Sequence, residues 1–419
     1  MPPSHRKRAG SEKGIRVRDM SKNDMILSGQ KETGGWVPKK VAYFGFDAAH
    51  TSVRRRMRQI SEVTELVGLT FRRTRYNSSY VPEWDNVDLG LLRDGHYLER
   101  LGVMAKSYGK IAAAGSKLRD VELVIARNLD LLALALMARA RGVFDAPIVY
   151  DVFDVRSVLL KSSIPARSMR TAERAMLRRC ALLVVTSPGF LRNYFEPYLG
   201  YQGPSLFLEN KVDLDILPED PEVRAAWRSP ARARTSLDPD RFVLGWVGAL
   251  RCARSAEMLA RIAQALPWLT VQISGKATYC STEAFLRTFE GIPNIIYTGE
   301  YWYPTGLYDV YRTIDLNWDF DLSKHGTSGG WLLPNRLYEG GYFGVPNLAE
   351  AGSETGDQVE EMGTGWTVRA DTDEIIELLR NIRGEYPSVK ARALAIMDSR
   401  FHYDGDIARI FDAVAVDAR

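Results

Sequence analysis

The chain has 419 residues, of which 45% are hydrophobic and 26% are charged, and its formal net charge at pH 7 is +4. This length predicts two domains or more, and no apolar run approaches the ~18–20 residues that a membrane-spanning helix needs. The charge is uneven, because residues 1–210 contain 34 Lys and Arg against 21 Asp and Glu, whereas acidic residues prevail in the remainder. A basic half indicates anionic partners, and an acidic half argues against a chain coated uniformly for nucleic acid.

The N-terminal segment and the cysteines narrow the class of protein further. Residues 1–37 are polar and basic and lack the apolar stretch of a secretory signal, so we expect a disordered basic tail. The three cysteines, Cys180, Cys252 and Cys280, are odd in number and widely spaced. Because they form no CxxC pair or Cys/His cluster, we expect buried thiols in a reducing compartment and no metal site.

The first half of the chain alternates apolar runs with helical patterns. The expected elements are strand 40–46, helix 51–63, strand 66–71, loop 72–96, helix 97–117, strand 121–126, helix 129–141, strand 147–150, helix 166–179, strand 181–186, helix 187–198 and strand 206–208. Such alternation predicts a parallel sheet covered by helices on both faces. Residues 209–239 carry acidic residues, prolines and a basic stretch, and are predicted to be a linker.

A second alternation follows the predicted linker. Its expected elements are strand 242–248, helix 255–266, strand 269–275, helix 281–289, strand 294–299, helix 306–313, strand 314–318, a glycine-rich loop 324–330, helix 335–342, strand 345–349, helix 356–362, strand 365–368 and a helical region 373–419. We therefore predict an α/β protein with two Rossmann-like domains, 38–208 and 240–395, facing each other across a cleft. Residues 396–419 are expected to form a helix that returns to the first domain.

The most informative stretch surrounds the predicted helix 335–342. Pro334 and Asn335 are residue types favoured at helix starts, and Arg336 and Glu339 share one face of the helix. A helix N-terminus and an arginine attract a diphosphate, and a carboxylate one turn later can accept both hydroxyls of a ribose. These residues indicate a nucleotide-sugar site. An ordinary helix with a surface ion pair is the alternative interpretation.

Read in order, the second half resembles the donor domain of the GT-B glycosyltransferases. The segments that carry the resemblance are Asn210-Lys-Val-Asp213, Gly248-Ala-Leu-Arg251 with Arg254, Ile273-Ser-Gly275, Ile296-Tyr-Thr-Gly299, Asn335-Arg-Leu-Tyr-Glu339 and Tyr342-Phe-Gly-Val-Pro346. The chain as a whole resembles the succinoglycan- and xanthan-type bacterial exopolysaccharide glycosyltransferases. The resemblance implies the GT-B fold and a transferase that moves a hexose, glucose being the first choice, from a UDP-sugar.

The resemblance also implies which residues hold the donor. The expected donor-binding residues are Gly248, Arg251, Arg254, Gly275, Ser328, Gly329, Arg336, Leu337 and Glu339. Arginines at a helix start would neutralise a diphosphate, although solvated helix-start arginines are the alternative. The loop Gly326-Thr-Ser-Gly-Gly330 could wrap phosphate or sugar with backbone donors, or be a flexible loop. Neither a cofactor nor a metal ion is expected.

The position eight residues before Glu339 bears on stereochemistry. Many retaining members of the superfamily have a second glutamate there, and this chain has Trp331. An inverting transferase needs one general base to take the proton of the attacking hydroxyl. Val149 and Tyr150, followed after three residues by Asp154, resemble the acceptor segment of xanthan-type glucuronosyltransferases, in which Asp154 matches the catalytic aspartate.

Two other residues are candidates for the general base. Asp151 precedes Asp154 by three residues, and either aspartate could instead cap the helix that follows. His50 lies on the first predicted loop, near Asp47 and the arginines 54–56, and a lone histidine is more often structural. An inverting mechanism with Asp154 as base is the interpretation that we favour.

The basic helices of the first half indicate the acceptor side. Residues 97–120 and 167–179 are rich in Lys and Arg, which suits an anionic membrane surface, although solvated helix faces are the alternative. We therefore expect a cytoplasmic protein, peripheral on the inner face of the plasma membrane, with a glycan or polyprenyl-diphosphate-linked acceptor. Three alternative hypotheses are a nucleotide-sugar epimerase of the same fold, a non-catalytic nucleotide-sugar-binding subunit and a nucleic-acid binder. No nucleic-acid motif supports the last one.

Overall fold

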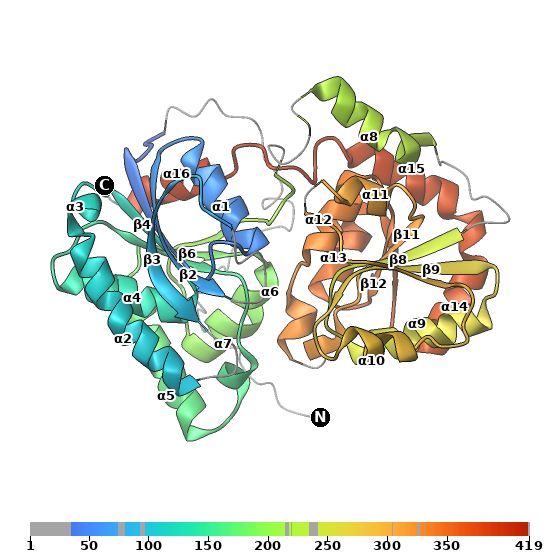
Figure 1. Ribbon diagram of the computed structural model, residues 1–419, viewed down its shortest axis with the longest axis horizontal. Coiled ribbons are helices and arrows are strands. Elements are labelled where there is room, and N and C mark those ends of the chain that lie inside the picture. Colours follow the sequence, from blue (N-terminus) through green and yellow to red (C-terminus); the bar gives the residue numbers. More distant parts are fainter. Residues whose placement is uncertain are drawn as a thin grey trace, which may run out of the picture. The chain divides into compact units, whose positions relative to one another are not determined.

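The computed structural model describes residues 35–73, 80–92, 97–213, 218, 220–233, 242–303, 305–324 and 327–417. Residues 1–34 of the predicted basic tail and Gly326 of the predicted loop lie outside this part of the chain. Two sheets are present, and every strand pair recorded in them is parallel. We call the parts of the chain built on the first and second sheet the first lobe and the second lobe (Figure 1).

The first lobe is built on a seven-stranded sheet in the order β3-β2-β1-β4-β5-β6-β7. Its strands are β1 (Lys40–Gly45), β2 (Glu65–Arg73), β3 (Asp85–Leu92), β4 (Leu123–Arg127), β5 (Ile148–Val152), β6 (Leu182–Val185) and β7 (Ser205–Phe207). Its helices are α1 (Thr51–Ser61), α2 (Tyr97–Ala113), α3 (Gly115–Leu118), α4 (Asn128–Ala140), α5 (Ile164–Leu177), α6 (Pro188–Phe190) and α7 (Glu196–Leu199). A 3₁₀-helix spans Ser157–Leu160 and a π-helix spans Leu191–Phe195.

The second lobe is built on a six-stranded sheet in the order β10-β9-β8-β11-β12-β13. Its strands are β8 (Phe242–Leu250), β9 (Leu269–Ala277), β10 (Ile295–Gly299), β11 (Leu316–Trp318), β12 (Asn347–Glu350) and β13 (Gly365–Val368). The helices of this part of the chain are α8 (Pro221–Ala233), α9 (Ala253–Ala265), α10 (Thr282–Arg287), α11 (Leu307–Tyr311), α12 (Asn335–Tyr342), α13 (Glu354–Met362), α14 (Thr372–Asn381), α15 (Tyr386–Ile396) and α16 (Ala408–Asp417).

The strands form parallel sheets because both of their faces are apolar. Along β1, Ala42 and Phe44 belong to one hydrophobic core, whereas Val41 and Tyr43 belong to the core on the other face. Helices cover both cores, so the central strands are buried on both faces. In each sheet the strand order reverses next to the first strand of its lobe, β1 or β8, and the carboxyl ends at such a point form a binding crevice.

Two segments differ from the sequence prediction. Residues 85–92, within the predicted loop 72–96, form β3, which pairs in parallel with β2 at the edge of the first sheet. The β3 sequence has few β-forming residues, and within the strand only Leu89 and Leu92 are buried. Its sequence pattern is therefore like that of a loop. Within the predicted linker 209–239, residues 221–233 form α8, whose Trp227 stacks on Tyr308 at 5.2 Å. Tertiary packing outweighed the proline signals there, and Pro221 occupies the first helical position, where proline is tolerated.

The last helix packs in the first lobe. Ile407, Ile410, Phe411 and Val414, from α16 and the residue before it, share a hydrophobic core with Val41 of β1. Figure 1 shows α16, in red, beside elements coloured blue. Among the described residues, no helix is long and apolar enough to cross a lipid bilayer.

Candidate active site

The carboxyl ends of β8 and β9 come together at two glycines. Gly248 and Gly275 are partners in the parallel register, and both have positive φ angles, 103° and 138°. A Cβ atom on Gly275 would lie 1.9 Å from the carbonyl oxygen of Gly248, so no other residue fits at position 275 without a shift of the backbone. A Cβ atom on Gly248 would meet no atom within 4 Å, so this strand end faces open space that a ligand can approach.

Arg251 and Arg254 follow this strand end but differ in their surroundings. Arg251 is about half exposed, and its Nε lies 3.7 Å from Oδ2 of Asp321. Burial favours the neutral form of Asp321, but Arg251, Arg336 and hydrogen bonds from Ser323 outweigh it and lower the pKa of this carboxyl. Arg254 donates instead to the carbonyl oxygen of Ala370 at 2.7 Å. Arg251 is therefore the better placed of the two to meet an anionic ligand beside Gly248.

Helix α12 begins at Asn335, as predicted, and buries Arg336 and Glu339. Nε of Arg336 lies 3.1 Å from Oδ1 of Asp319, and its Nη2 donates to the carbonyl oxygen of Phe320 at 2.8 Å. Burial raises the pKa of Asp319 to about 7, against the opposing effect of Arg336. Arg336 is thus paired within the second lobe, and Leu337 beside it is a core residue that is 1% exposed.

Glu339 is paired with the first lobe. Its Oε1 lies 3.8 Å from Nη2 of Arg55 on α1, and the two side chains are 5% and 1% exposed. Arg55 also donates to the hydroxyl of Tyr303 and, at 2.6 Å, to the carbonyl oxygen of Asn210. Burial raises the pKa of Glu339, although Arg55 and Arg336 act to lower it. A buried carboxylate with one long ion-pair contact can accept hydrogen bonds from ribose hydroxyls.

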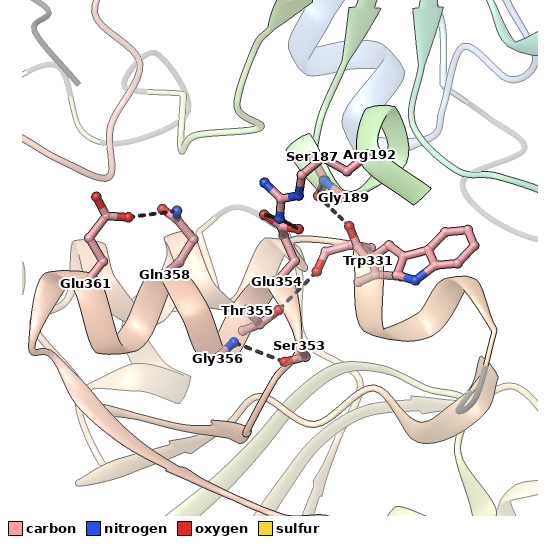
Figure 2. A network of polar contacts seen from close by, with 11 residues as sticks. Ser187, Gly189, Arg192, Trp331, Ser353, Glu354, Thr355, Gly356, Gln358 and Glu361 are labelled. Atoms are coloured by element: carbon pink, nitrogen blue, oxygen red, sulfur yellow. Dashed lines mark hydrogen bonds and ion pairs between the residues drawn. The ribbon is translucent and has the colours of Figure 1, made fainter. Parts of the chain in front are cut away.

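The described end of the predicted glycine-rich loop forms a turn that contacts the first lobe. Residues Ser328–Trp331 form a 3₁₀ turn, in which Ser328 and Gly329 are buried. The Ser328 hydroxyl donates to the carbonyl oxygen of Val155 in the first lobe at 3.0 Å. Trp331 is partly buried against the core of the first lobe, and the Ser187 hydroxyl donates to its carbonyl oxygen. This segment therefore joins the two lobes (Figure 2).

A second connection lies at the start of α13. Arg192 of the π-helix donates to both carboxylate oxygens of Glu354, at 3.0 and 2.7 Å (Figure 2). Thr355 donates to the carbonyl oxygen of Leu332 at 3.0 Å, and Ser353 caps the helix by accepting from the Gly356 amide at 3.0 Å. The backbone of residues 331–332 is consequently held from both lobes.

Among the three candidate bases, Asp151 is fully buried and His50 is half-buried. His50 precedes α1, and its Nδ1 lies 2.9 Å from the Ser52 hydroxyl. Burial, with Arg127, Arg73 and Arg251, lowers the pKa of His50 to about 3. Asp151 is 0% exposed, and Oδ2 accepts from the Tyr43 hydroxyl at 3.3 Å and lies 3.6 Å from Nε of Arg56.

Asp154 is the exposed member of the three. It follows β5 and lines a pocket of the first lobe together with Arg156. It lies just beyond the carboxyl end of β5, where parallel sheets commonly place their binding sites. Asp154 is therefore open to solvent, whereas Asp151 is held inside the lobe by Tyr43 and Arg56.

Several residues of the site were not predicted from the sequence. Asp319 directly follows the buried strand β11 and Asp321 lies two residues further on, and polar residues at such a strand end are a recognisable signal. Tyr303 and the contact of Arg55 with Glu339 leave no local signal, because the partners are far apart in the sequence.

Comparison with solved structures places the fold among the GT-B glycosyltransferases. Sucrose-phosphate synthase from Thermosynechococcus elongatus superimposes with a TM-score of 0.67 at 14% identity, over 89% of this chain and 97% of that one. Anabaena HepE in complex with UDP superimposes with a TM-score of 0.64 at 14% identity, over 90% of this chain and 99% of the other. No protein-family model matches the chain.

A curated relative defines the family. The chain is 32% identical over 318 residues to succinoglycan biosynthesis protein ExoL of Rhizobium meliloti (strain 1021), which is 75% of this chain and 77% of that protein. The chain therefore belongs to the ExoL family of succinoglycan biosynthesis proteins. The predicted fold and the predicted resemblance are both confirmed.

Proposed function

We propose that the protein is a glycosyltransferase of exopolysaccharide synthesis that moves a hexose, glucose being the first choice, from a UDP-sugar to a glycan acceptor. The observation that carries the proposal is the arrangement of Glu339 on α12 with the open Gly248–Gly275 strand ends and Arg251. Membership of the ExoL family and the UDP complex of HepE support it. Neither favours an epimerase or a non-catalytic subunit.

In the proposed reaction, each group has a task that suits its surroundings. The acceptor hydroxyl oxygen attacks the anomeric carbon while the bond from that carbon to the β-phosphate oxygen breaks. The hydroxyl proton passes to the Asp154 carboxylate, which is the exposed candidate base. UDP leaves with the broken bond's electron pair, and Arg251 and backbone N–H groups stabilise its charge without a metal ion. Attack from the face opposite the leaving group inverts the anomeric centre.

The acceptor is proposed to be lipid-linked and to be met at the cytoplasmic face of the membrane. The basic first half of the chain and the exposed Arg167 of α5 support contact with anionic lipid. Two other arginines of this helix are already bound to backbone carbonyls, Arg170 to Lys161 at 2.9 Å and Arg174 to Leu199 at 2.8 Å. Part of the helix is thus structural rather than free for lipid.

Calorimetric titration with UDP tests the proposal. Wild type is expected to bind, and Glu339→Gln, which keeps the volume of the buried side chain, is expected to bind at least about tenfold more weakly. Glu361→Ala, which removes an exposed carboxylate of α13, is the matched control and is expected to bind as wild type does. Asp154→Asn should keep UDP affinity and lose transfer by about 10²- to 10⁴-fold. A wild type that binds neither UDP, GDP nor ADP would show that the transferase proposal is wrong.

A further inference from the structure

A pocket of about 70 Å³ lies in the first lobe beyond the carboxyl ends of β4 and β5. The proposed reaction uses only Asp154 from its lining and leaves the rest without a task. The volume holds several water molecules or one end of a sugar ring. The carbonyl oxygen of Val155, another lining residue, accepts from Ser328 at 3.0 Å, so the pocket wall touches the second lobe.

The inner wall of the pocket is a buried carboxylate held by two tyrosines. Glu173 of α5 is 2% exposed and accepts from the Tyr150 hydroxyl at 2.8 Å and from the Tyr194 hydroxyl. Phe195 packs edge-on against both tyrosine rings, at centroid distances of 6.2 and 5.1 Å. Aromatic rings beside fixed polar groups are the usual lining of a pocket that binds a small polar ligand.

Two backbone features indicate that the lining is built for more than packing. Asn128, at the start of α4, has a φ angle of 66° and is the one non-glycine residue of the described chain with positive φ. Its Oδ1 is buried and lacks a hydrogen-bond partner. Tyr194 and Phe195 belong to the π-helix Leu191–Phe195. Strained residues and π-helical turns are both found more often at functional sites than elsewhere.

The charges of the lining select the ligand. Arg156 is the one basic residue among the lining residues that the structure describes, and it is paired with Asp130 at 2.8 Å. Asp154 and Glu173 contribute carboxyl groups to the same pocket. A phosphate or diphosphate would meet two acidic side chains and a cation that is already engaged, whereas sugar hydroxyls can both donate and accept hydrogen bonds here.

We infer that this pocket is a subsite for an uncharged hexose residue of the acceptor, which it holds beside Asp154 and in which Asn128, Tyr150 and Tyr194 determine specificity. The inference rests on the proposed function and deepens it, because it assigns the sugar end of the acceptor to the first lobe. The anionic carrier of such an acceptor would lie outside the pocket.

Saturation-transfer NMR with methyl β-D-glucopyranoside and methyl β-D-galactopyranoside, in the presence of UDP, tests the subsite. Wild type should transfer saturation to at least one of the hexosides. Leu159→Trp, which fills the pocket from a side chain that is 3% exposed, should abolish the signal. Val158→Trp, which adds the same indole at a neighbouring position that is 37% exposed, should keep it. UDP affinity should be the same in all three proteins.

Asn128→Gly provides a second test in case Leu159→Trp fails to fold. Glycine adopts a positive φ without strain, so this variant keeps the backbone and removes only the amide, and hexoside affinity should fall about tenfold. The inference is overturned if wild type binds neither hexoside, or if Leu159→Trp and Asn128→Gly both leave the saturation-transfer signal unchanged. It is also overturned if glucose 6-phosphate binds more tightly than the methyl hexosides. If wild type does not bind UDP, that result would instead count against the proposed function.

Discussion

Arg336 of the second lobe shows how a charge that looks free in the sequence is already paired in the folded chain. Arg336 was predicted to hold a diphosphate, and the structure pairs it with Asp319 at 3.1 Å. Glu339 was predicted to hold a ribose, and it lies 3.8 Å from Arg55 of the other lobe. A nucleotide entering the site would therefore share Glu339 with Arg55, and Arg251 remains the best-placed cation for its phosphates.

Replacement of Arg55 by alanine should destabilise the protein strongly. The change removes the ion-pair partner that Glu339 has on α1, and breaking a buried pair from one side costs about 3 kcal/mol or more. Arg54→Ala is the matched control, because Arg54 is partly exposed and its guanidinium lies over the Tyr80 ring at 4.3 Å, an interaction worth about 1 kcal/mol or less. Urea denaturation measures both. Equal losses for the two variants would mean that the buried pair contributes little.

His50 should make stability depend on pH. Its pKa is about 3 in the folded protein and 6.5 when unperturbed, so the folded state binds fewer protons between these values. The stability contribution is complete above pH 6.5 and is lost as the pH falls. From about pH 7.5 to about pH 5.5, wild type should lose about 1 kcal/mol more than His50→Gln. Parallel pH profiles of the two unfolding free energies would contradict the low pKa.

At the scale of elements, the contact of α6 with the second lobe depends on a residue without a side chain. Gly189 lies so close that a Cβ atom there would be 2.6 Å from Oε2 of Glu354 and 2.8 Å from the carbonyl oxygen of Trp331. Arg192 donates to the Glu354 carboxylate, and the Ser187 hydroxyl donates to the carbonyl oxygen of Trp331 (Figure 2). Short elements that follow β6 therefore determine how closely residues 331–332 approach the first lobe.

Gly189→Ala should disturb this contact. We expect a loss of about 1–3 kcal/mol, because the added methyl group must displace backbone as well as the Glu354 side chain. Gly109→Ala on α2, where a Cβ atom meets nothing within 4 Å, should instead be neutral or stabilise by up to about 1 kcal/mol. Thermal denaturation of the two variants measures the difference. A Gly189→Ala protein as stable as wild type would show that the lobes can separate at this point without cost.

For the whole molecule, the apolar periodicity of the sequence was enough to predict both sheets. Strands such as β1 and β8 are buried on both faces, so their apolar runs are continuous. The edge strand β3 and helix α8 were missed, because both depend on tertiary contacts and not on local pattern. The site divides in the same way between local sequence pattern and tertiary contact. Gly248 and Glu339 could be predicted from the residues around them in the sequence. The ion-pair partners of Arg336, Arg55 and Asp151 could not, because they lie on other elements.

The core that α16 shares with β1 affects the order in which the two lobes can fold during synthesis. Residues 407–414 belong to the same core as Val41, although they are synthesised after the whole second lobe. Domains commonly fold as they leave the ribosome, starting from the N-terminal end. The first lobe cannot complete its core in this way, because residues 407–414 are translated only after the second lobe. An unfinished chain would expose that apolar surface, which makes the nascent first lobe a candidate for chaperone protection.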